Sequence, residues 1–553
     1  MIMLAKFKDI LKRQINSITA AAALVALSSL ASRFLGVVRD RILAGSFGAG
    51  TTLDVYYAAF RVPDLVYNLI VLGALSSGFI PIFTSLIKDF VCERGQGCDP
   101  TLQNKEAWSL ASNVLNYLFI GLGLLSLLGI IFAPALTRLI TPGFGPSEQA
   151  ATAALTRIMF LSPIFLGISG ILGGILQSFK RFVVYSLAPV FYNLGIIIGA
   201  LFFVNWWGVY GLAWGVVLGA FMHMAVQIPM VSRLGFKYQF RIRRRDPQTR
   251  KIGQMMVPRT LSLAISQINL VVVTALASGL AGGSLAIFNF ANNLQSFPIG
   301  IFGISFAIAA FPSLSAAAFD KEKLTANFSQ SFRQILFFII PATVLIVALR
   351  AQIIRVVLGT GRFDWQDTIL TMNTLGFFAL SLFAQATIPL LVRVFYARHN
   401  SATPFYIGLF TVAVNTALAL WLAPRMGVTG LALAFSIDNV LNFLLLWIWL
   451  SLKIGNLDLG RITRSVAKFL LAALAAGGAA QIMKVLVWPY IDMTKFSGVF
   501  IQLLAGSAAG ILVYALFCYL LKSEEFFGFV AVLGWRHPFK KVQTDDQGEA
   551  RGV

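Results

Sequence analysis

Long apolar stretches recur along the chain, each separated from the next by a short polar segment. A helix needs about 20 residues to cross a hydrocarbon core of about 30 Å, and these stretches have that length. The pattern predicts fourteen membrane-spanning helices, at 15–44, 54–87, 109–137, 153–178, 183–204, 209–232, 255–281, 285–316, 334–358, 369–392, 403–424, 427–452, 469–487 and 496–521. The second and eighth spans are longer than a straight crossing needs and contain Pro63 and Pro298, so we expect both to bend.

The composition agrees with a membrane protein and excludes other classes. Hydrophobic residues make up 58% of the chain and charged residues 12%, whereas soluble domains average about 25% charged residues. A soluble enzyme, a disordered chain and a disulfide-stapled secreted domain are therefore excluded. Cys92, Cys98 and Cys518 form no CxxC pair, so no metal site is expected. The fold class predicted is an all-α polytopic membrane protein.

The distribution of basic residues predicts the orientation. With the N-terminus inside, 32 Lys and Arg residues fall on the inner side and 8 on the opposite side. Cytoplasmic loops collect Lys and Arg, so both termini are expected in the cytoplasm. The densest basic run, Arg241 to Arg245, is interpreted as a topology anchor near anionic lipid head groups, with no role in nucleic-acid binding.

A short motif occurs twice and predicts an internal repeat. Gly208-Val-Tyr-Gly211-Leu-Ala recurs 219 residues later as Gly427-Val-Thr-Gly430-Leu-Ala. Spans one to six and seven to twelve are therefore interpreted as pseudo-symmetric six-helix lobes, and transporters with such repeats hold substrate between them. The expected segments are a basic cytoplasmic N-terminus (1–14), an N-lobe (15–232), a basic cytoplasmic linker (233–254), a C-lobe (255–452), two C-terminal helices (453–521) and a cytoplasmic tail (522–553).

Charged residues cluster in the first two spans. A charge at the bilayer centre costs about 2.5–3.5 kcal/mol, so such residues are functional candidates. The cluster comprises Arg33, Arg39, Asp40, Arg41, Asp54, Arg61 and Asp64. One interpretation is that Arg39, Asp40 and Arg41 mark the outer end of the first helix and reach the interface. The other is that the arginines form a cationic site for an anionic substrate, because the arginine fork binds diphosphate bidentately. Asp54 is expected to pair with an arginine or to couple a cation.

Uncharged polar residues mark later spans. Asn289, Asn293 and Ser296 follow the spacing of one helix face, which suits either hydrogen bonding between helices or the lining of a cavity. Asp438 is a lone acid in the twelfth span, interpreted as an ion or proton site or as a partner of Asn442. No P-loop, metal-ligand spacing or catalytic grouping occurs, so no catalytic residue, enzymatic activity or cofactor is expected.

One family resembles the chain at these residues. The run from Ser32 to Asp40 (SRFLGVVRD), together with Asp54 and Arg61-Val-Pro63, is similar to the MurJ (MviN) family of the multidrug/oligosaccharidyl-lipid/polysaccharide exporter superfamily. The resemblance implies a bacterial inner-membrane flippase that translocates lipid II, a polyprenyl-diphosphate-linked peptidoglycan precursor, by alternating access. It also implies a central cavity between two lobes and a lipid-tail groove at the last two helices.

The resemblance also assigns roles to residues. Arg33 and Arg39 would meet the diphosphate and sugar head group, Asp54 would be important, and Arg61 matches a basic position of the family. Four positions depart from the family pattern, which has an arginine and a glutamate on each of helices 2 and 8; here they are Tyr67, Leu72, Asn293 and Ser296.

The leading hypothesis is therefore a lipid II flippase driven by the membrane potential or a coupling ion. Its expected partners are a lipid-linked diphosphate saccharide, the bilayer and cell-wall synthesis machinery. The alternatives are a flippase for another lipid-linked oligosaccharide, a drug/cation antiporter of the same superfamily, and a non-transporting membrane scaffold.

Overall fold

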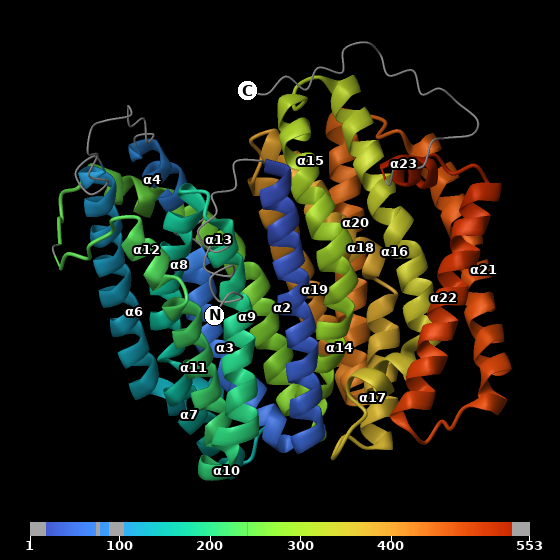
Figure 1. Cartoon of the computed structure of the whole chain (residues 1–553), viewed down its shortest axis with the longest axis horizontal. Coiled ribbons are helices and arrows are strands. Elements are labelled where there is room, and N and C mark those ends of the chain that lie inside the picture. Colours follow the sequence, from blue (N-terminus) through green and yellow to red (C-terminus); the bar gives the residue numbers. More distant parts are fainter. Residues whose placement is uncertain (1–17, 73–77, 88–103, 241, 533–553) are drawn as a thin grey trace, which may run out of the picture. The chain divides into compact units, whose positions relative to one another are not determined.

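The computed structural model describes residues 18–72, 78–87, 104–240 and 242–532, and over these residues it is helical with no strand (Figure 1). Cys92, Cys98, Arg241 and the segments 1–14 and 533–553 of the sequence analysis lie outside the described residues.

The helices of the first half begin and end as follows, with π-helical turns marked η1 and η3: α2 (Ile18–Phe47), α3 (Thr51–Tyr67), η1 (Asn68–Leu72), α4 (Ile80–Leu86), α6 (Lys105–Ile140), α7 (Pro146–Met159), α8 (Ser162–Ser178), α9 (Phe182–Ile198), η3 (Gly199–Phe203), α10 (Val204–Trp207), α11 (Tyr210–Ala225) and α12 (Ile228–Arg233).

The second half continues with a π-helical turn η4 and a short 3-10 helix η5: α13 (Pro247–Ser278), α14 (Ser284–Pro298), η4 (Ile299–Ile304), α15 (Ser305–Ala316), α16 (Lys321–Val357), α17 (Trp365–Ala379), α18 (Leu382–Ala397), α19 (Ala402–Met426), α20 (Val428–Ile454), α21 (Leu459–Val487), η5 (Trp488–Tyr490), α22 (Phe496–Leu520) and α23 (Glu524–Val532).

Most of these helices are membrane spans by length and composition. Ten helical stretches among the described residues qualify, and the pair α17 and α18 makes an eleventh with a bend of 45°. Each of the eleven coincides with a predicted span. The other three predicted spans fall on α2, on α3 to α4 and on α13, which this count does not include. The structure thus confirms an all-α polytopic membrane protein, and the number fourteen stays a prediction.

π-helical turns follow the two prolines for which bends are predicted, and the bends themselves stay predictions. Pro298 immediately precedes η4, and Pro63 lies inside α3 ahead of η1. A proline in a helix removes one backbone donor and clashes with the preceding turn, so the regular hydrogen-bond pattern is disturbed nearby. The bend between Ala379 and Leu382 has no proline, and the sequence analysis did not predict it.

The chain divides into two compact units. Unit 1 comprises Met1–Phe297, Ile354–Phe378 and Ala402–Asn442, and unit 2 comprises Pro298–Ile353, Ala379–Ser401 and Phe443–Val553. The lobe boundaries at residues 232 and 255 stay a prediction, because these units group the helices differently from the predicted lobes.

In unit 1, glycines allow α9 and the π-helical turn η3 that follows it to pack closely against α11. A Cβ atom on Gly195 would lie 2.3 Å from the Cα atom of Gly219, and one on Gly199 would lie 2.3 Å from the Cα atom of Gly215. Small residues of this kind let helix backbones approach each other in membranes, where no hydrophobic effect drives association.

The repeated glycine motif folds in the same way in both places. Gly208 and Gly427 have φ values of 56° and 62°, and each ends one helix before the next begins. A Cβ atom on Gly211 would lie 2.4 Å from the carbonyl carbon of Phe203, and one on Gly430 would lie 2.5 Å from the carbonyl oxygen of Leu422. The two sequence copies therefore form the same tight helix–helix turn, which supports an internal repeat.

In unit 2, α16 packs against the antiparallel pair α21 and α22. Cβ atoms on Gly477, Gly506 and Gly510 would lie 2.5 to 3.0 Å from side chains of α16. The hydroxyl of Tyr514 on α22 donates to the carbonyl oxygen of Phe337 on α16 at 2.7 Å. The short helix α23 follows α22 and supplies two acidic side chains to a charged cavity described below.

Candidate functional site

Arg39 and Asp40 lie side by side near the C-terminal end of α2. Nε and Nη2 of Arg39 donate to Oδ1 of Asp40 at 3.0 and 2.8 Å, and Nη1 donates to Oδ1 of Asn193 on α9 at 3.1 Å. Nδ2 of Asn193 in turn donates to Ser32 and to the carbonyl oxygen of Pro189. These bonds hold the guanidinium in place, and the Arg39 side chain is 22% exposed, so it remains accessible to a ligand.

Helix α14 reaches the same cluster with two polar residues. Nδ2 of Asn293 donates to Oδ2 of Asp40 at 2.8 Å, so both carboxylate oxygens of Asp40 have a partner. Nη1 of the half-buried Arg33 donates to the carbonyl oxygen of Ser296 at 3.3 Å. This is its one hydrogen bond within the described part of the chain, and it involves a neutral acceptor. Arg33 therefore keeps most of its donors and its full charge.

Arg61 on α3 is held by neutral oxygens. Its Nε donates to the hydroxyl of Thr274 on α13 at 2.8 Å, and its Nη2 donates to Oδ1 of Asn289 on α14 at 2.9 Å. Neither partner carries charge, so these bonds orient the guanidinium without neutralising it.

Asp54 has a different role from the arginines. Its side chain is buried, and its two oxygens accept hydrogen bonds from the backbone N–H groups of Gly283 at 2.6 Å and Ala286 at 2.8 Å. These groups begin α14, so a carboxylate on α3 caps another helix and favours its positive end. The sequence predicts an arginine partner or a coupled cation for Asp54, whereas its described partners are backbone amides.

Asp438 is buried on α20 within unit 1. Its Oδ1 has no hydrogen-bond partner among the described residues, and no hydrogen bond to Asn442 occurs there. The carboxyl lies within hydrogen-bonding reach of the Thr411 side chain on α19. Its interpretation as an ion or proton site stays a prediction.

All predicted site residues fall in one unit, and the structure adds two residues that contact them. Unit 1 contains every predicted site residue: Arg33, Arg39, Asp40, Asp54, Arg61, Asn289, Asn293 and Asp438. Sequence reasoning missed Asn193 and Thr274, which orient Arg39 and Arg61. Asn193 could have been found from the sequence, because an amide side chain is unusual in the apolar span 183–204. A single threonine such as Thr274 does not stand out in a membrane span.

Three of the four positions that depart from the family pattern have described side chains, and the side chain of Leu72 lies outside the described ones. Asn293 binds Asp40, and the carbonyl oxygen of Ser296 accepts from Arg33. Both replaced positions on α14 therefore touch the arginine cluster. Tyr67 is half-buried at the end of α3.

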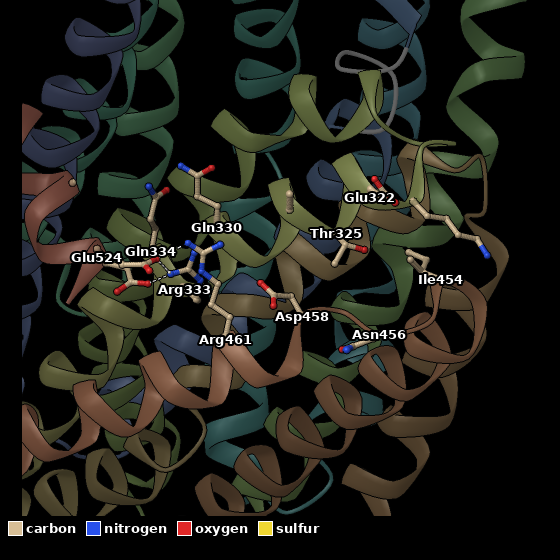
Figure 2. A pocket seen from close by; sticks show the side chains of 14 residues that line it. Glu322, Thr325, Gln330, Arg333, Gln334, Ile454, Asn456, Asp458, Arg461 and Glu524 are labelled. Atoms are coloured by element: carbon tan, nitrogen blue, oxygen red, sulfur yellow. Dashed lines mark hydrogen bonds and ion pairs between the residues drawn. The ribbon is translucent and has the colours of Figure 1, made fainter. Parts of the chain in front are cut away.

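A second charged region lies at one end of unit 2. A cavity of about 790 Å³ is lined by α16, by the segment that joins α20 to α21, by α21 and by α23 (Figure 2). Figure 2 shows Arg333 and Arg461 close together, and both pair with Glu524, at 3.3 and 2.7 Å. Arg333 also forms an ion pair with the buried Glu525. These pairs hold α23 against α16 and α21.

The pairing changes the acidity of Glu524. Partial burial raises the pKa of this carboxyl, but the hydrogen bond and charge of Arg461, with the charge of Arg333, outweigh burial. The net pKa is below the ordinary value of 4.5, so Glu524 is an anion at neutral pH.

The arrangement in unit 1 suits an anionic ligand. Arg33, Arg39 and Arg61 stay protonated at any physiological pH and have planar donor forks that match phosphate oxygens. The one acid that pairs directly with an arginine in this cluster, among the described residues, is Asp40. Neutral amides, a hydroxyl and a backbone carbonyl accept the other hydrogen bonds of the three arginines. Asp64 on α3 adds a second negative charge near Arg61 and Arg39, so the three arginines still outnumber the acids that face them.

The fold is that of a transporter class known from solved structures. The chain is similar to a structure described as "Lipid II flippase MurJ, inward closed conformation", with a TM-score of 0.72 and 23% identity, covering 90% of this chain and 100% of that one. It is also similar to an inward-facing multidrug resistance MATE family transporter of the MOP superfamily, with a TM-score of 0.63 and 16% identity, covering 77% of this chain and 95% of that one.

Sequence comparison identifies the family. The model described as "Lipid II flippase MurJ" matches residues 43–501. A probable lipid II flippase MurJ of Rhizobium tropici is 30% identical over 82% of this chain and 84% of its own length. Another, of Bdellovibrio bacteriovorus, is 28% identical over 95% of this chain and 96% of its own length. The chain belongs to the MurJ family; it is a multi-pass inner-membrane transporter and not an enzyme.

Proposed function

We propose that this protein moves lipid II from the inner to the outer leaflet by alternating access, and that the arginines of unit 1 bind its diphosphate. The relatives described above are named lipid II flippases or probable ones. The observation that carries the site assignment is the fixed guanidinium of Arg39, held between Asp40 and Asn193.

The charge of the cluster favours a diphosphate over a cation. Asp40 is occupied by Arg39 and Asn293, and both oxygens of Asp54 accept backbone amides. A drug/cation antiporter needs acids that are available to the cargo. Asp40 and Asp54 are already bonded, and the charge of a third acid, Asp64 on α3, is opposed by the nearby charges of Arg61 and Arg39. The arginines suit the anionic head group of lipid II and of related lipid-linked oligosaccharides, which remain the second candidate substrates.

Contacts between distant segments of unit 1 support a closed outer end. Arg41 donates to the carbonyl oxygen of Val356, and the backbone N–H of Ala49 donates to Asp367 at 3.0 Å. Asp54 caps α14 at the same end of α2 and α3. In the predicted orientation this end faces outward, so these bonds close the outer side and must break before a head group leaves.

The energy source belongs to the same proposal. Moving one charge through 100 mV of membrane potential is worth about 2.3 kcal/mol, which would bias an arginine-bound state. A coupling ion at Asp438 is the alternative source. We place both termini in the cytoplasm, where the basic loops are available to cell-wall synthesis machinery.

The test is the exposure of lipid II on the outer leaflet. Cells depleted of their own flippase would express this chain or its Arg39→Ala variant, and a probe that reaches the outer leaflet would measure accessible lipid II. The wild-type chain should restore exposure, and Arg39→Ala should abolish most of it.

A matched control uses an arginine outside the cluster. Arg425 lies at the exposed end of α19 and stacks on Trp421, 4.8 Å from the ring centroid. Arg425→Ala removes the same charge and should leave lipid II exposure intact. Absence of exposure with a well-inserted wild-type chain would refute lipid II as the substrate and favour another lipid-linked saccharide.

A further inference from the structure

The first turns of α21 in unit 2 present three cations on one face. Arg461, Arg464 and Lys468 follow i, i+3 and i+7 spacing, which places them on the same side of a helix. They line a hollow of about 240 Å³ together with Gly460, Ser465 and Glu524. All six lining residues belong to unit 2 and none belongs to the arginine cluster of unit 1, so the transport proposal does not use this hollow.

The hollow has more positive than negative charge. Its one acid, Glu524, already pairs with Arg461 at 2.7 Å and with Arg333 at 3.3 Å. Lys468 donates through Nζ to the carbonyl oxygen of Lys522 at 3.2 Å, a contact that leaves its charge uncompensated. Arg464 is exposed and has no hydrogen bond or ion pair within the described part of the chain. Arg464 and Lys468 are therefore available to an anion.

The neighbouring cavity differs in this respect. It has a volume of about 790 Å³, but Arg333 pairs directly with Glu524 and Glu525, and Arg461 pairs with Glu524 (Figure 2). Asp458 accepts a hydrogen bond from the hydroxyl of Ser329. Its charged groups largely satisfy one another, so it shows no preference for an anion.

The surface just beyond the hollow is apolar. Leu470, Leu471 and Leu474 on α21 are 46%, 59% and 65% exposed. In a chain that spans a membrane, such leucines face lipid. A lipid whose anionic head group lies in the hollow would therefore have room for its acyl or prenyl chains beside these leucines of α21. In the predicted topology, the segments 453–468 and 522–553 lie on the cytoplasmic side, where anionic head groups are found.

We propose that the hollow formed by Arg461, Arg464 and Lys468 binds a phosphate group carried by a lipid. Two sources share this chemistry: the head group of an anionic phospholipid, and the diphosphate of a polyprenyl lipid. The second source rests on the proposed function, because it would make the hollow a first capture point for the substrate. Arginine and lysine form charge-assisted hydrogen bonds to phosphate oxygens, and basic pockets beside membrane helices suit such head groups.

The experiment measures binding to the purified full-length chain in detergent by native mass spectrometry. The probes are dioleoyl phosphatidylglycerol, farnesyl diphosphate, inorganic phosphate and the zwitterionic dioleoyl phosphatidylcholine. The Arg464→Gln/Lys468→Gln variant should bind phosphatidylglycerol or farnesyl diphosphate about tenfold more weakly than the wild type, or weaker still. The lipid that the wild-type chain binds more tightly, phosphatidylglycerol or farnesyl diphosphate, identifies which kind of lipid carries the phosphate group.

The control removes the same charge elsewhere on the predicted cytoplasmic side. Lys323 and Lys453 are exposed and do not line the hollow, so Lys323→Gln/Lys453→Gln should bind like the wild type. Equal binding by the wild type and the Arg464/Lys468 variant would overturn the proposal. Inorganic phosphate binding as tightly as both lipids would also overturn it.

The thermal unfolding midpoint of each variant checks that loss of binding is not loss of folding. Arg464→Gln alone alters only an exposed side chain and should still weaken binding severalfold. Because no transport is measured, failure of this test leaves the proposed function standing, and failure of lipid II exposure leaves the phospholipid source testable.

Discussion

Two side chains accept hydrogen bonds from Arg39, one adjacent to it in the sequence and one far from it. Asp40 is its immediate neighbour, whereas Asn193 is 154 residues away on α9. Asp40 supplies charge, and Asn193 fixes the direction of the guanidinium without neutralising it. A cation that stays charged and is already oriented loses less entropy when a ligand binds, so Asn193 is a positioning residue for the proposed diphosphate site.

Asn193→Ala tests this role. The variant removes a hydrogen bond to a charged group, which is worth about 1.5–3 kcal/mol, so lipid II exposure should fall by about tenfold or more. The leaflet-accessibility assay measures it, with the amount of inserted protein as reference. Asn205→Ala is the matched control, because the exposed Asn205 bonds only to a carbonyl oxygen of its own helical segment, that of Leu201. Equal losses of lipid II exposure in the Asn193→Ala and Asn205→Ala variants would contradict the role of Asn193 in positioning Arg39.

At the scale of elements, glycines determine how closely two helices meet. Gly211 and Gly430 follow left-handed glycines in the two copies of the repeated motif, and each faces the backbone of the preceding helix. The backbones lie so close at these positions that a Cβ atom does not fit, and glycine is the one residue type without a Cβ atom. The repeated motif therefore encodes a turn and not a ligand site.

Gly211→Ala and Gly430→Ala should each destabilise the protein. The new methyl group would overlap backbone atoms at 2.4 and 2.5 Å, and overpacking of this kind costs about 1–3 kcal/mol. The thermal unfolding midpoint in detergent should fall in both variants. Gly121→Ala is the control, because nothing lies within 4 Å of its Cβ position inside α6, and alanine favours the helix there. An unchanged midpoint for both motif variants would contradict the close packing.

The attachment of α23 should depend on pH. The folded pKa of Glu524 lies below the ordinary 4.5, so its ion pairs stabilise the docked helix above that value and are lost as the pH falls through the folded pKa. Hydrogen–deuterium exchange, corrected for intrinsic rates, should show weaker protection of residues 524–532 in acid, below the folded pKa of Glu524, than at neutral pH.

Two variants separate this effect from general acid unfolding. Glu524→Gln should reduce protection of α23 at pH 6.5 and flatten the pH dependence. Asp492→Asn, which changes an exposed acid before α22, should behave like the wild type. A pH dependence unaffected by Glu524→Gln would assign it to another group.

At the scale of the whole molecule, the distribution of basic residues predicts the orientation in the membrane. Lys453 belongs to the predicted inner side and Lys495 to the predicted outer side, and both are exposed. In a background with Ser at Cys92, Cys98 and Cys518, a membrane-impermeant maleimide should label Lys495→Cys in intact cells. It should label Lys453→Cys only after the membrane is opened. The reverse pattern would invert the topology.

The sequence alone was sufficient for the class and for the main site candidates. Span lengths depend on local hydrophobicity, and eleven predicted spans match helices of the structure. Arg33, Arg39 and Arg61 stood out because a charge in a span is costly. The glycine repeat was visible because its requirement is local.

The tertiary structure decided which atoms these residues touch. Asp54 meets α14 across 229 residues, and Arg61 meets Asn289 across 228 residues. No local pattern encodes such pairs, because they depend on how helices pack and on which rotamers fit. The neutral partners Asn193 and Thr274, the capping role of Asp54 and the cationic hollow on α21 appear only when distant segments are brought together. The sequence therefore determined a membrane transporter of the MurJ family with an arginine-rich start, and the packing of its helices determined how those arginines are held.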